Sequence, residues 1–238
     1  MAESTLSIQY SEIAREVGHM VGWGRDITQW TSTQLVDFVD ILKRGSRMFY
    51  FPPMPEGQPV YEWTFLRTIG SITLVTGDYT YTLPDDFGGT ILDRSVTWPV
   101  GNGNRMLTKI SEQDIRKNQA YDNQSGVPKY YAVRNLTHAP TTGQRWELLT
   151  YPTPSAAVNG IVLSYSYVFV PNVITSANKY PVGGAQYSEV ILSAILAAAE
   201  YKEDDDPSGP YHQKFQELLQ VAMRNDEQQK SNDRKGKA

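Results

Sequence analysis

The chain begins with two stretches in which apolar residues recur at helical spacing. The first stripe runs through residues 5–22 and stops at Gly22 and Gly24. A second helix follows Thr31, one of three residues suited to N-capping, and should end before Pro52. Its predicted buried face consists of Leu35, Val36, Phe38, Val39, Ile41 and Leu42.

From about residue 60 to residue 171, apolar and polar positions alternate with period two, which predicts a mostly antiparallel β region. One short helix interrupts the pattern where Ser111 can cap residues 112–121, with Asp114 as an acidic variant of the capping box. The strand-like runs are Tyr61 to Phe65 and residues 72–74, 79–83, 89–98, 129–135, 145–152 and 161–170.

The helical period returns at about residue 185 in a segment rich in Ala, Leu and Ile. An acidic run ending at Pro207 breaks it, and Asp206 or Ser208 can cap a last amphipathic helix. The pattern therefore predicts an α+β fold in which N- and C-terminal helices form one bundle. Its parts are N-terminal helices (1–58), an inserted β-rich domain (59–174), C-terminal helices (175–226) and a polar tail (227–238) that orders only on a partner.

Composition limits the chemistry. A formal net charge of -4 argues against a broad surface for duplex DNA. The absence of cysteine excludes disulfides, zinc–thiolate sites and cysteine nucleophiles, and three histidines argue against a histidine-rich metal centre. The start shows no signal peptide, and the longest apolar stretch, within residues 190–199, is too short to span a bilayer. We therefore expect a soluble protein made in the cytoplasm, without cofactor, metal or membrane.

The acidic pair Asp85 and Asp86 allows two interpretations. A metal or acid–base site needs further carboxylates or a histidine; none lies nearby in sequence, and a partner from elsewhere in the chain stays open. A turn needs only what surrounds the pair, because Pro84 follows a strand and two glycines complete the corner. We predict the turn, and a hydrolase using both aspartates remains the alternative. The structural turn motif comprises Tyr81, Leu83, Pro84, Asp86 and Phe87.

Several motifs, taken in order, resemble the head-to-tail adaptor proteins of tailed bacteriophages. YTYTLPDDFGG (79–89) is similar to that family's Tyr-x-Leu-Pro-x-Asp-Phe element. GVPKYYAV (126–133), WELLTYPTP (146–154) and YSYVFVPNVIT (165–175) resemble its later strands. An Ala-rich helix, an acidic break and a last helix complete the order. The likeness covers about residues 30–226 and is to neck proteins of the podovirus tubular-protein-A type and related adaptors.

The resemblance implies a structural virion protein without catalytic residues. Such proteins form a ring, usually of twelve copies, beneath the portal at the capsid vertex. The β domain meets the next tail or nozzle protein, and double-stranded DNA passes transiently through the lumen. The protein would be assembled in the host cytoplasm and reside in the virion neck.

Two groups of residues carry the expected contacts. A basic C-terminal segment can dock on an acidic partner surface, although the same charges can simply be solvated. The expected portal-docking residues are Arg224, Lys230, Arg234, Lys235 and Lys237. The expected inter-subunit packing residues, on the helix that is apolar all round, are Ile191, Leu192, Ile195 and Leu196. Deletion of residues 224–238 should then weaken docking and leave the fold intact.

A second reading keeps the protein in the virion but changes its role. The tyrosine-rich strands of residues 59–174 favour a β-domain binding module that recognises a partner protein or a glycan. We expect a tyrosine-rich surface on the β domain, and clear hits on a glycan array would favour this alternative.

Overall fold

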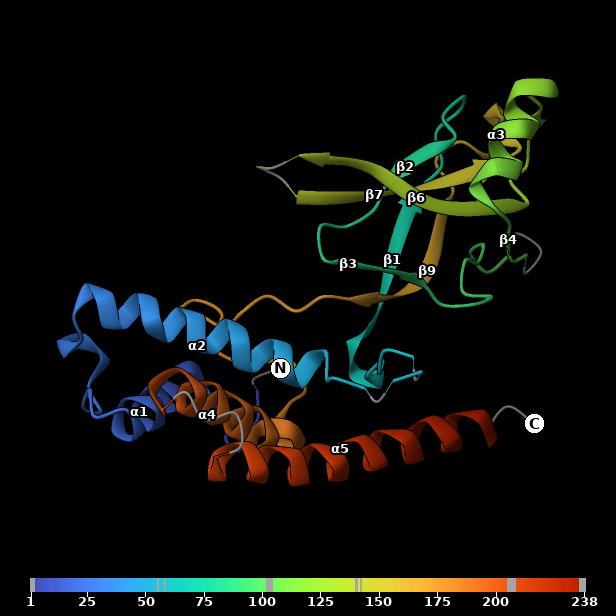
Figure 1. Cartoon of the computed structure of the whole chain (residues 1–238). Coiled ribbons are helices and arrows are strands. Elements are labelled where there is room, and N and C mark those ends of the chain that lie inside the picture. The colour runs from blue at the N-terminus through green and yellow to red at the C-terminus, as the bar shows by residue number, and fades with distance from the viewer. Residues whose placement is uncertain are drawn as a thin grey trace. The chain divides into compact units, whose positions relative to one another are not determined.

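The computed structural model describes residues 3–54, 56–57, 59–101, 105–139, 141, 143–204 and 209–235 (Figure 1). Contacts divide the chain into two compact units. The helical unit combines Met1–Leu66 with Pro171–Ala238, and the β unit is Arg67–Val170. The chain thus has the expected α+β fold, in which a β-rich segment is inserted between N- and C-terminal helices.

The helical unit is a bundle built from both ends of the chain. Its helices are α1 (Tyr10–Met20), α2 (Ser32–Tyr50), α4 (Ser188–Asp204) and α5 (Pro210–Lys235). Helix α4 packs against the other three, which confirms the predicted bundle. Close approach depends on Gly45 of α2, since a Cβ atom there would lie 2.6 Å from the Ile195 Cα of α4.

Helix ends follow the predicted capping chemistry. Thr31 caps α2, and its side chain and that of Gln34 form a reciprocal capping box. In the β unit, helix α3 (Glu112–Tyr121) begins where the Asp114 amide donates to Ser111 Oγ at 3.1 Å. Helix α1 is followed by Gly22 and Gly24, both at positive φ, a backbone conformation that glycine adopts without strain.

The buried face of α2 is narrower than predicted. Phe38, Ile41 and Leu42 are buried, but Leu35, Val36 and Val39 are exposed. At 100° per residue, six residues between positions 35 and 42 span too wide an arc for one interface. The buried trio points into the bundle, and the other three form a second apolar stripe beside it.

The β unit contains three small sheets. Their strand orders are β1-β9-β3, β2-β7-β6-β4 and β5-β8. The long pairs β1–β9 and β6–β7 are antiparallel, whereas β4–β6 and β5–β8 are parallel. The strands are β1 (Arg67–Thr73), β2 (Thr80–Thr82), β3 (Phe87–Ile91), β4 (Thr108–Lys109), β5 (Ser125–Gly126), β6 (Tyr130–Ala139), β7 (Gly143–Tyr151), β8 (Thr153–Pro154) and β9 (Val162–Phe169).

Tyrosines fill the core of the β unit more than they cover its surface. Tyr131, Tyr165 and Tyr167 belong to the main apolar cluster, together with Leu148 and Leu163. Tyr151 belongs to a second cluster in which Ile115 of α3 meets Ala132 and Leu149. Tyr79, Tyr121 and Tyr130 are exposed, so the β unit has tyrosines both in its core and on its surface.

The segment that precedes the β unit is not a strand, contrary to the prediction from its alternation. Tyr61 and Trp63 are buried, and Thr64–Leu66 form a 3-10 turn. Both aromatic rings belong to the helical unit, where Trp63 lies against Phe49 of α2 and donates to its carbonyl oxygen at 3.0 Å. Period two is common to any extended segment with one buried side, so it did not distinguish this docked segment from a paired strand.

Helix α5 extends further than the sequence predicts, and a carboxylate from α4 binds its first amides. Its backbone continues to Lys235, so the tail expected from residue 227 begins as helix. At the other end, Asp206 and Ser208 lie outside the described residues. The buried Glu200 of α4 accepts hydrogen bonds from the Tyr211 and His212 amides at 3.3 and 3.0 Å. A carboxylate there satisfies free amides and complements the helix dipole.

Candidate docking surface on the C-terminal helix

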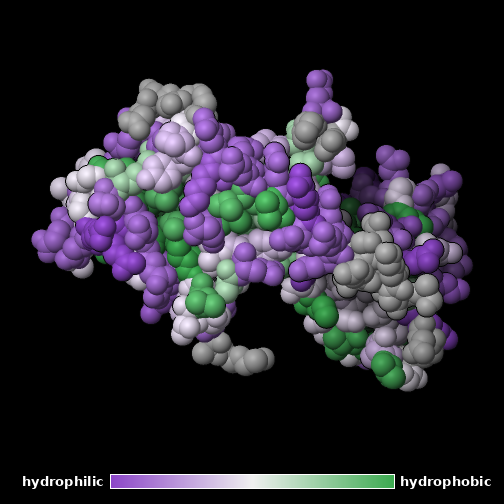
Figure 2. Space-filling view, turned by 90° about the horizontal axis from the view of Figure 1, so that it is seen from below, coloured by the Kyte–Doolittle hydropathy of each residue, from purple (hydrophilic) through white to green (hydrophobic). Residues whose placement is uncertain are grey.

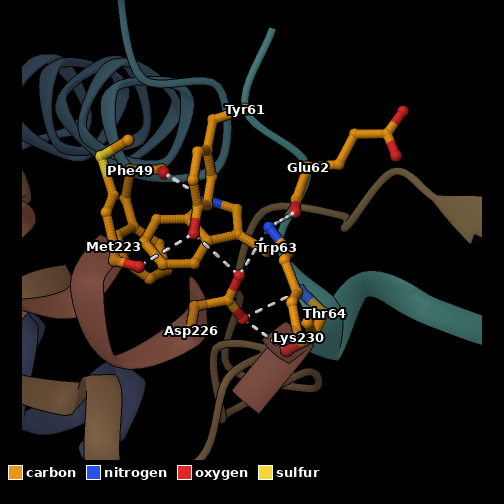
Figure 3. A network of polar contacts seen from close by, with 8 residues as sticks. All are labelled: Phe49, Tyr61, Glu62, Trp63, Thr64, Met223, Asp226 and Lys230. Carbon is orange, nitrogen blue, oxygen red and sulfur yellow. Dashed lines mark hydrogen bonds and ion pairs between the residues drawn. The ribbon is translucent and has the colours of Figure 1, made fainter. Parts of the chain in front are cut away.

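One buried carboxylate fixes α5 to the segment that follows α2. Asp226 is 0% exposed and faces Tyr61 and Thr64 (Figure 3). The Tyr61 hydroxyl lies 2.9 Å from Asp226 Oδ2 and 3.0 Å from the Met223 carbonyl oxygen. The Thr64 amide donates to Asp226 Oδ1 at 3.0 Å, and the Thr64 hydroxyl donates to the same oxygen. We call this group, with Lys230, the Asp226 anchor.

Lys230 completes the anchor one turn further along α5. Its Nζ lies 2.9 Å from Asp226 Oδ2, donates to the Glu62 carbonyl oxygen at 2.6 Å and stands 4.0 Å from the centre of the Tyr61 ring. Only 20% of the side chain is exposed. A buried carboxylate is tolerated when it is paired and fully hydrogen-bonded, and Lys230 supplies the compensating charge.

The anchor shifts the protonation of its members in opposite directions. Burial by itself would raise the pKa of Asp226, but hydrogen bonds from Thr64, Lys230 and Tyr61 outweigh it, and the pKa lies below its ordinary value. Burial, followed by the hydrogen bond to Asp226, raises the pKa of Tyr61 well above the ordinary value. Asp226 therefore stays ionised and Tyr61 stays neutral at neutral pH.

The expected portal-docking residues occupy three different environments. Arg224 is exposed on α5. Lys230 is held within the anchor, so its ammonium group is already engaged by its own chain. Arg234 and Lys235 lie on the last turn of the described helix, whereas Lys237 lies outside the described residues.

The four residues expected to pack between subunits divide in a similar way. Ile191 and Ile195 are buried inside the helical unit, where Ile195 packs against Gly45 of α2. Leu192 and Leu196 are half-buried, and Leu196 lines a cavity of about 510 Å³ together with Glu200 and Tyr211. The all-round apolar character of α4 is thus explained by three neighbours within one chain, which leaves at most Leu192 and Leu196 for a neighbouring copy.

The Asp85–Asp86 pair lies in the turn between β2 and β3. The Phe87 amide donates to the Pro84 carbonyl oxygen at 3.0 Å, and the Phe87 side chain is buried. Asp85 is ion-paired with Arg145 at the surface. The Tyr167 hydroxyl donates to Asp86 Oδ1 at 3.0 Å, and burial together with this bond raises the pKa of Tyr167 to about 12. Each aspartate thus has a structural partner within the β unit.

The rest of the motif surrounds this corner. Leu83 is buried in the main apolar cluster, and Tyr81 packs against that cluster while its hydroxyl donates to the Asp78 carbonyl oxygen at 2.9 Å. Within the described part of the chain, no three His, Asp or Glu side chains come together as a metal site requires. Among the helices described, none has the length and apolar content needed to cross a bilayer.

The sequence-based prediction missed two buried carboxylates, Glu200 and Asp226. Their partners are not adjacent in sequence: Glu200 binds amides 11 and 12 positions on, and Asp226 binds Thr64 and Tyr61 across 162 and 165 positions. The only local hint was the Asp226–Lys230 pair at i,i+4 spacing, which is also typical of an exposed helix.

Comparison with known proteins assigns the chain to a family, which the geometry alone does not do. No curated protein matches the chain significantly. A family model described as SU10 adaptor protein matches residues 8–236 and so includes both helical ends and the β unit. A match of this extent establishes membership and goes beyond the expected likeness over residues 30–226. The chain belongs to the SU10 adaptor protein family and is a structural adaptor of a bacteriophage virion.

Proposed function

We propose that this adaptor joins the capsid vertex to the tail as a ring beneath the portal, through whose lumen the genome passes. The observation that carries the proposal is the family match over residues 8–236, which spans the helical and the β units. A ring of twelve copies is the assembly that the resemblance to head-to-tail adaptors implies. The formal net charge of -4 supports a lumen along which DNA slides without binding.

In this proposal the end of α5 docks on the portal, and the β unit meets the next tail or nozzle protein. The Asp226 anchor binds the C-terminal half of α5, and the helix continues beyond it to Lys235. Residues 230–238 include four basic residues and one acidic residue. The same charges also favour the C-terminal end of a helix, so a docking role must be separated from helix stability by experiment.

The position of the anchor changes which deletion is informative. Removal of residues 224–238 would delete Asp226 and Lys230 and so release Tyr61 and Thr64. We therefore no longer expect this deletion to leave the fold intact. Removal of residues 231–238 keeps every residue of the anchor, and it shortens α5 only beyond Lys230.

The experiment is co-assembly of the purified chain with the portal of the same phage, followed by electron microscopy and a binding titration. The intact chain should form a ring on the portal. The chain lacking residues 231–238 should bind at least about tenfold more weakly, because charged rim contacts are lost. Hydrogen exchange of residues 61–66 should be the same in both chains, which shows that the anchor survives.

A matched pair of charge reversals separates specific docking from general charge. Arg234→Glu should weaken portal binding, whereas Arg15→Glu, at an exposed position of α1, should not. The weakening should diminish at high salt, where exposed charges are screened. A chain that ignores the portal and forms no ring with it would refute the proposal.

A further inference from the structure

Helix α2 presents an apolar stripe to solvent. Leu35, Val36 and Val39 are exposed, with Val36 at 63%. Their spacing of i, i+1 and i+4 places them in one stripe of the helix, directly beside the buried stripe of Phe38, Ile41 and Leu42. We call Leu35, Val36 and Val39 the α2 ridge.

The same helical unit carries a concave apolar surface. A groove of about 180 Å³ lies between the start of α4 and the middle of α5. Its apolar walls are Val190, Leu218, Val221 and Ala222, with Gln186 and Asn225 also lining it. Val221 is 53% exposed. We call this the α4–α5 groove.

The size of the groove favours side chains as its occupants. Pockets for small molecules usually enclose roughly 300–1,000 Å³ and bury most of the ligand. A groove of about 180 Å³ is smaller than that, yet it suits the branched aliphatic side chains of a helix laid across it. An amphipathic helix with anchors at i and i+4 matches this shape, and the α2 ridge has that spacing.

The charges permit both surfaces to be covered together. The ridge residues are uncharged, and Glu189, the acidic side chain among the described residues that line the groove, is paired with Lys214 at 2.6 Å. No unpaired charge among the described lining residues would thus have to be buried on contact, which would otherwise oppose association. Any partner of the groove must offer an apolar surface and must bring no unpaired charge into the contact. The α2 ridge of the same chain meets both conditions.

We infer that the α2 ridge of one copy seats in the α4–α5 groove of the next copy. This inference rests on the proposed ring. A ring of identical subunits requires two different, complementary surfaces on each copy, and a ridge and a groove on one chain meet that requirement. In a closed ring every ridge and every groove is covered, so neither apolar surface remains in water.

The contact should be weak between two isolated copies. Stable interfaces bury about 1,200–2,000 Å² in total, which is far more than a three-residue ridge can provide alone. The hydrophobic areas visible in Figure 2 are likewise small patches bordered by hydrophilic side chains. Closure of a ring strengthens such contacts, because each copy is held on two sides. The test therefore has to trap a short-lived contact.

The natural absence of cysteine makes site-specific crosslinking direct. Val36→Cys and Val221→Cys are combined in one chain and treated with a short bismaleimide, free in solution and bound to the portal of the same phage. The double variant should give a ladder of covalent multimers. Neither single variant should crosslink alone, and an equal mixture of the two should stop at dimers. A matched control pairs Val221→Cys with Val60→Cys, another exposed valine of the helical unit, and should give no ladder.

A second variant shows that the contact, and not random collision, produces the ladder. Val36→Glu is added to a chain with Val39→Cys and Val221→Cys, which keeps both thiols and places a carboxylate in the groove. Because Val36 is exposed, the fold should be unaffected while the ladder is lost. Retention of the ladder in this variant overturns the inference.

The remaining outcomes distinguish this inference from the proposed function. Crosslinking of Val36→Cys alone indicates a ridge-to-ridge dimer, and crosslinking of the double variant to the portal itself indicates a different occupant; both overturn the inference. Absence of a ladder both free in solution and on the portal also overturns the inference. Portal binding without a ladder leaves the proposed function standing, whereas a ladder without portal binding removes the proposed function and keeps the inference.

Discussion

The buried carboxylates Asp226, in the helical unit, and Glu147, in the β unit, reach their farthest partners over very different distances along the chain. In the helical unit, Asp226 binds Tyr61 and Thr64 across 165 and 162 positions. In the β unit, Arg134 and Glu147 form their pair across 13 positions and are direct neighbours in the β6–β7 register. The first network closes the chain onto itself, and the second reinforces a hairpin that backbone hydrogen bonds already define.

The comparison indicates where a single change is most damaging. A long-range network is formed only after distant segments have met, so no local structure replaces it when one member is lost. A cross-strand pair is supported on both sides by the ladder. The helical unit should therefore respond strongly to changes at its few contact points, and the β unit more weakly to comparable changes.

The largest expected effect is that of Asp226→Ala. It removes the acceptor of four hydrogen bonds and leaves Lys230 largely buried without a carboxylate, which should cost about 3 kcal/mol. Urea unfolding followed by circular dichroism measures the loss. Hydrogen exchange should show that residues 61–66 open first while the β unit stays protected.

The control for this variant is Glu227→Ala on the adjacent, exposed position of the same helix. It should change the free energy of unfolding by less than about 0.5 kcal/mol. If both variants behave alike, the anchor does not hold the helical unit together, and the contrast between the units is lost.

The next effect concerns glycines at close contacts, one in each unit. A Cβ at Gly45 would lie 2.6 Å from the Ile195 Cα, whereas at Gly70 of β1 it would meet the outer part of the Tyr165 ring at 2.6–2.9 Å. A backbone cannot move aside as a ring end can, so Gly45→Ala should cost about 2 kcal/mol and Gly70→Ala about 1 kcal/mol. Thermal or urea unfolding of both variants gives the comparison.

The result at Gly45 is informative because helix propensity acts in the opposite direction. Alanine favours a helix over glycine by about 1 kcal/mol, so a neutral or stabilising Gly45→Ala would show that α2 and α4 separate easily. In that case the two helices are not closely fixed, and the packing argument for the helical unit fails.

Low pH should weaken the Asp226 anchor of the helical unit. The Asp226 pKa is lowered in the folded protein, so its contribution to stability is complete above the unfolded value of about 4 and is lost as pH falls through the lowered folded value. Hydrogen exchange between pH 5 and pH 2 should therefore show residues 61–66 losing protection in this window. Asp226→Asn cannot titrate, and its stability should depend less on pH there; an unchanged dependence contradicts the assignment.

Much of this fold was predictable from local signals. The period of 3.6, the Thr31 and Ser111 caps and the long β6–β7 and β9 runs all reflect interactions within a few residues or one hairpin. The docked Tyr61 segment was mistaken for a strand, since period two reports a buried side and not its partner.

The less predictable features depend on tertiary contacts. Neither the burial of Asp226 nor the role of Glu200 as a cap follows from neighbouring residues, because their partners arrive only through folding. The predicted buried face of α2 was also too wide, since hydrophobicity alone does not distinguish a buried helix face from an exposed apolar one. Docking through α5 stays a prediction, and the structure adds that Lys230 is already engaged within its own chain.

The smallest effects concern the acidic corner of the β unit, where two adjacent aspartates should differ. Asp86→Ala removes the acceptor of the buried Tyr167 hydroxyl and should cost about 1–2 kcal/mol. Asp85→Ala removes a carboxylate that is 79% exposed, with only a surface pair to Arg145, and should cost less than about 0.5 kcal/mol.

Asp86→Asn provides the matched control for the corner, because its amide oxygen can still accept from Tyr167. It should recover most of the stability that Asp86→Ala loses, as measured by urea unfolding with hydrogen exchange of the β2–β3 turn. Recovery would assign the effect to one hydrogen bond and confirm that the β unit responds locally. Equal losses in Asp86→Asn and Asp86→Ala would mean that the negative charge matters, and then the acidic pair would need an explanation other than the shape of a turn.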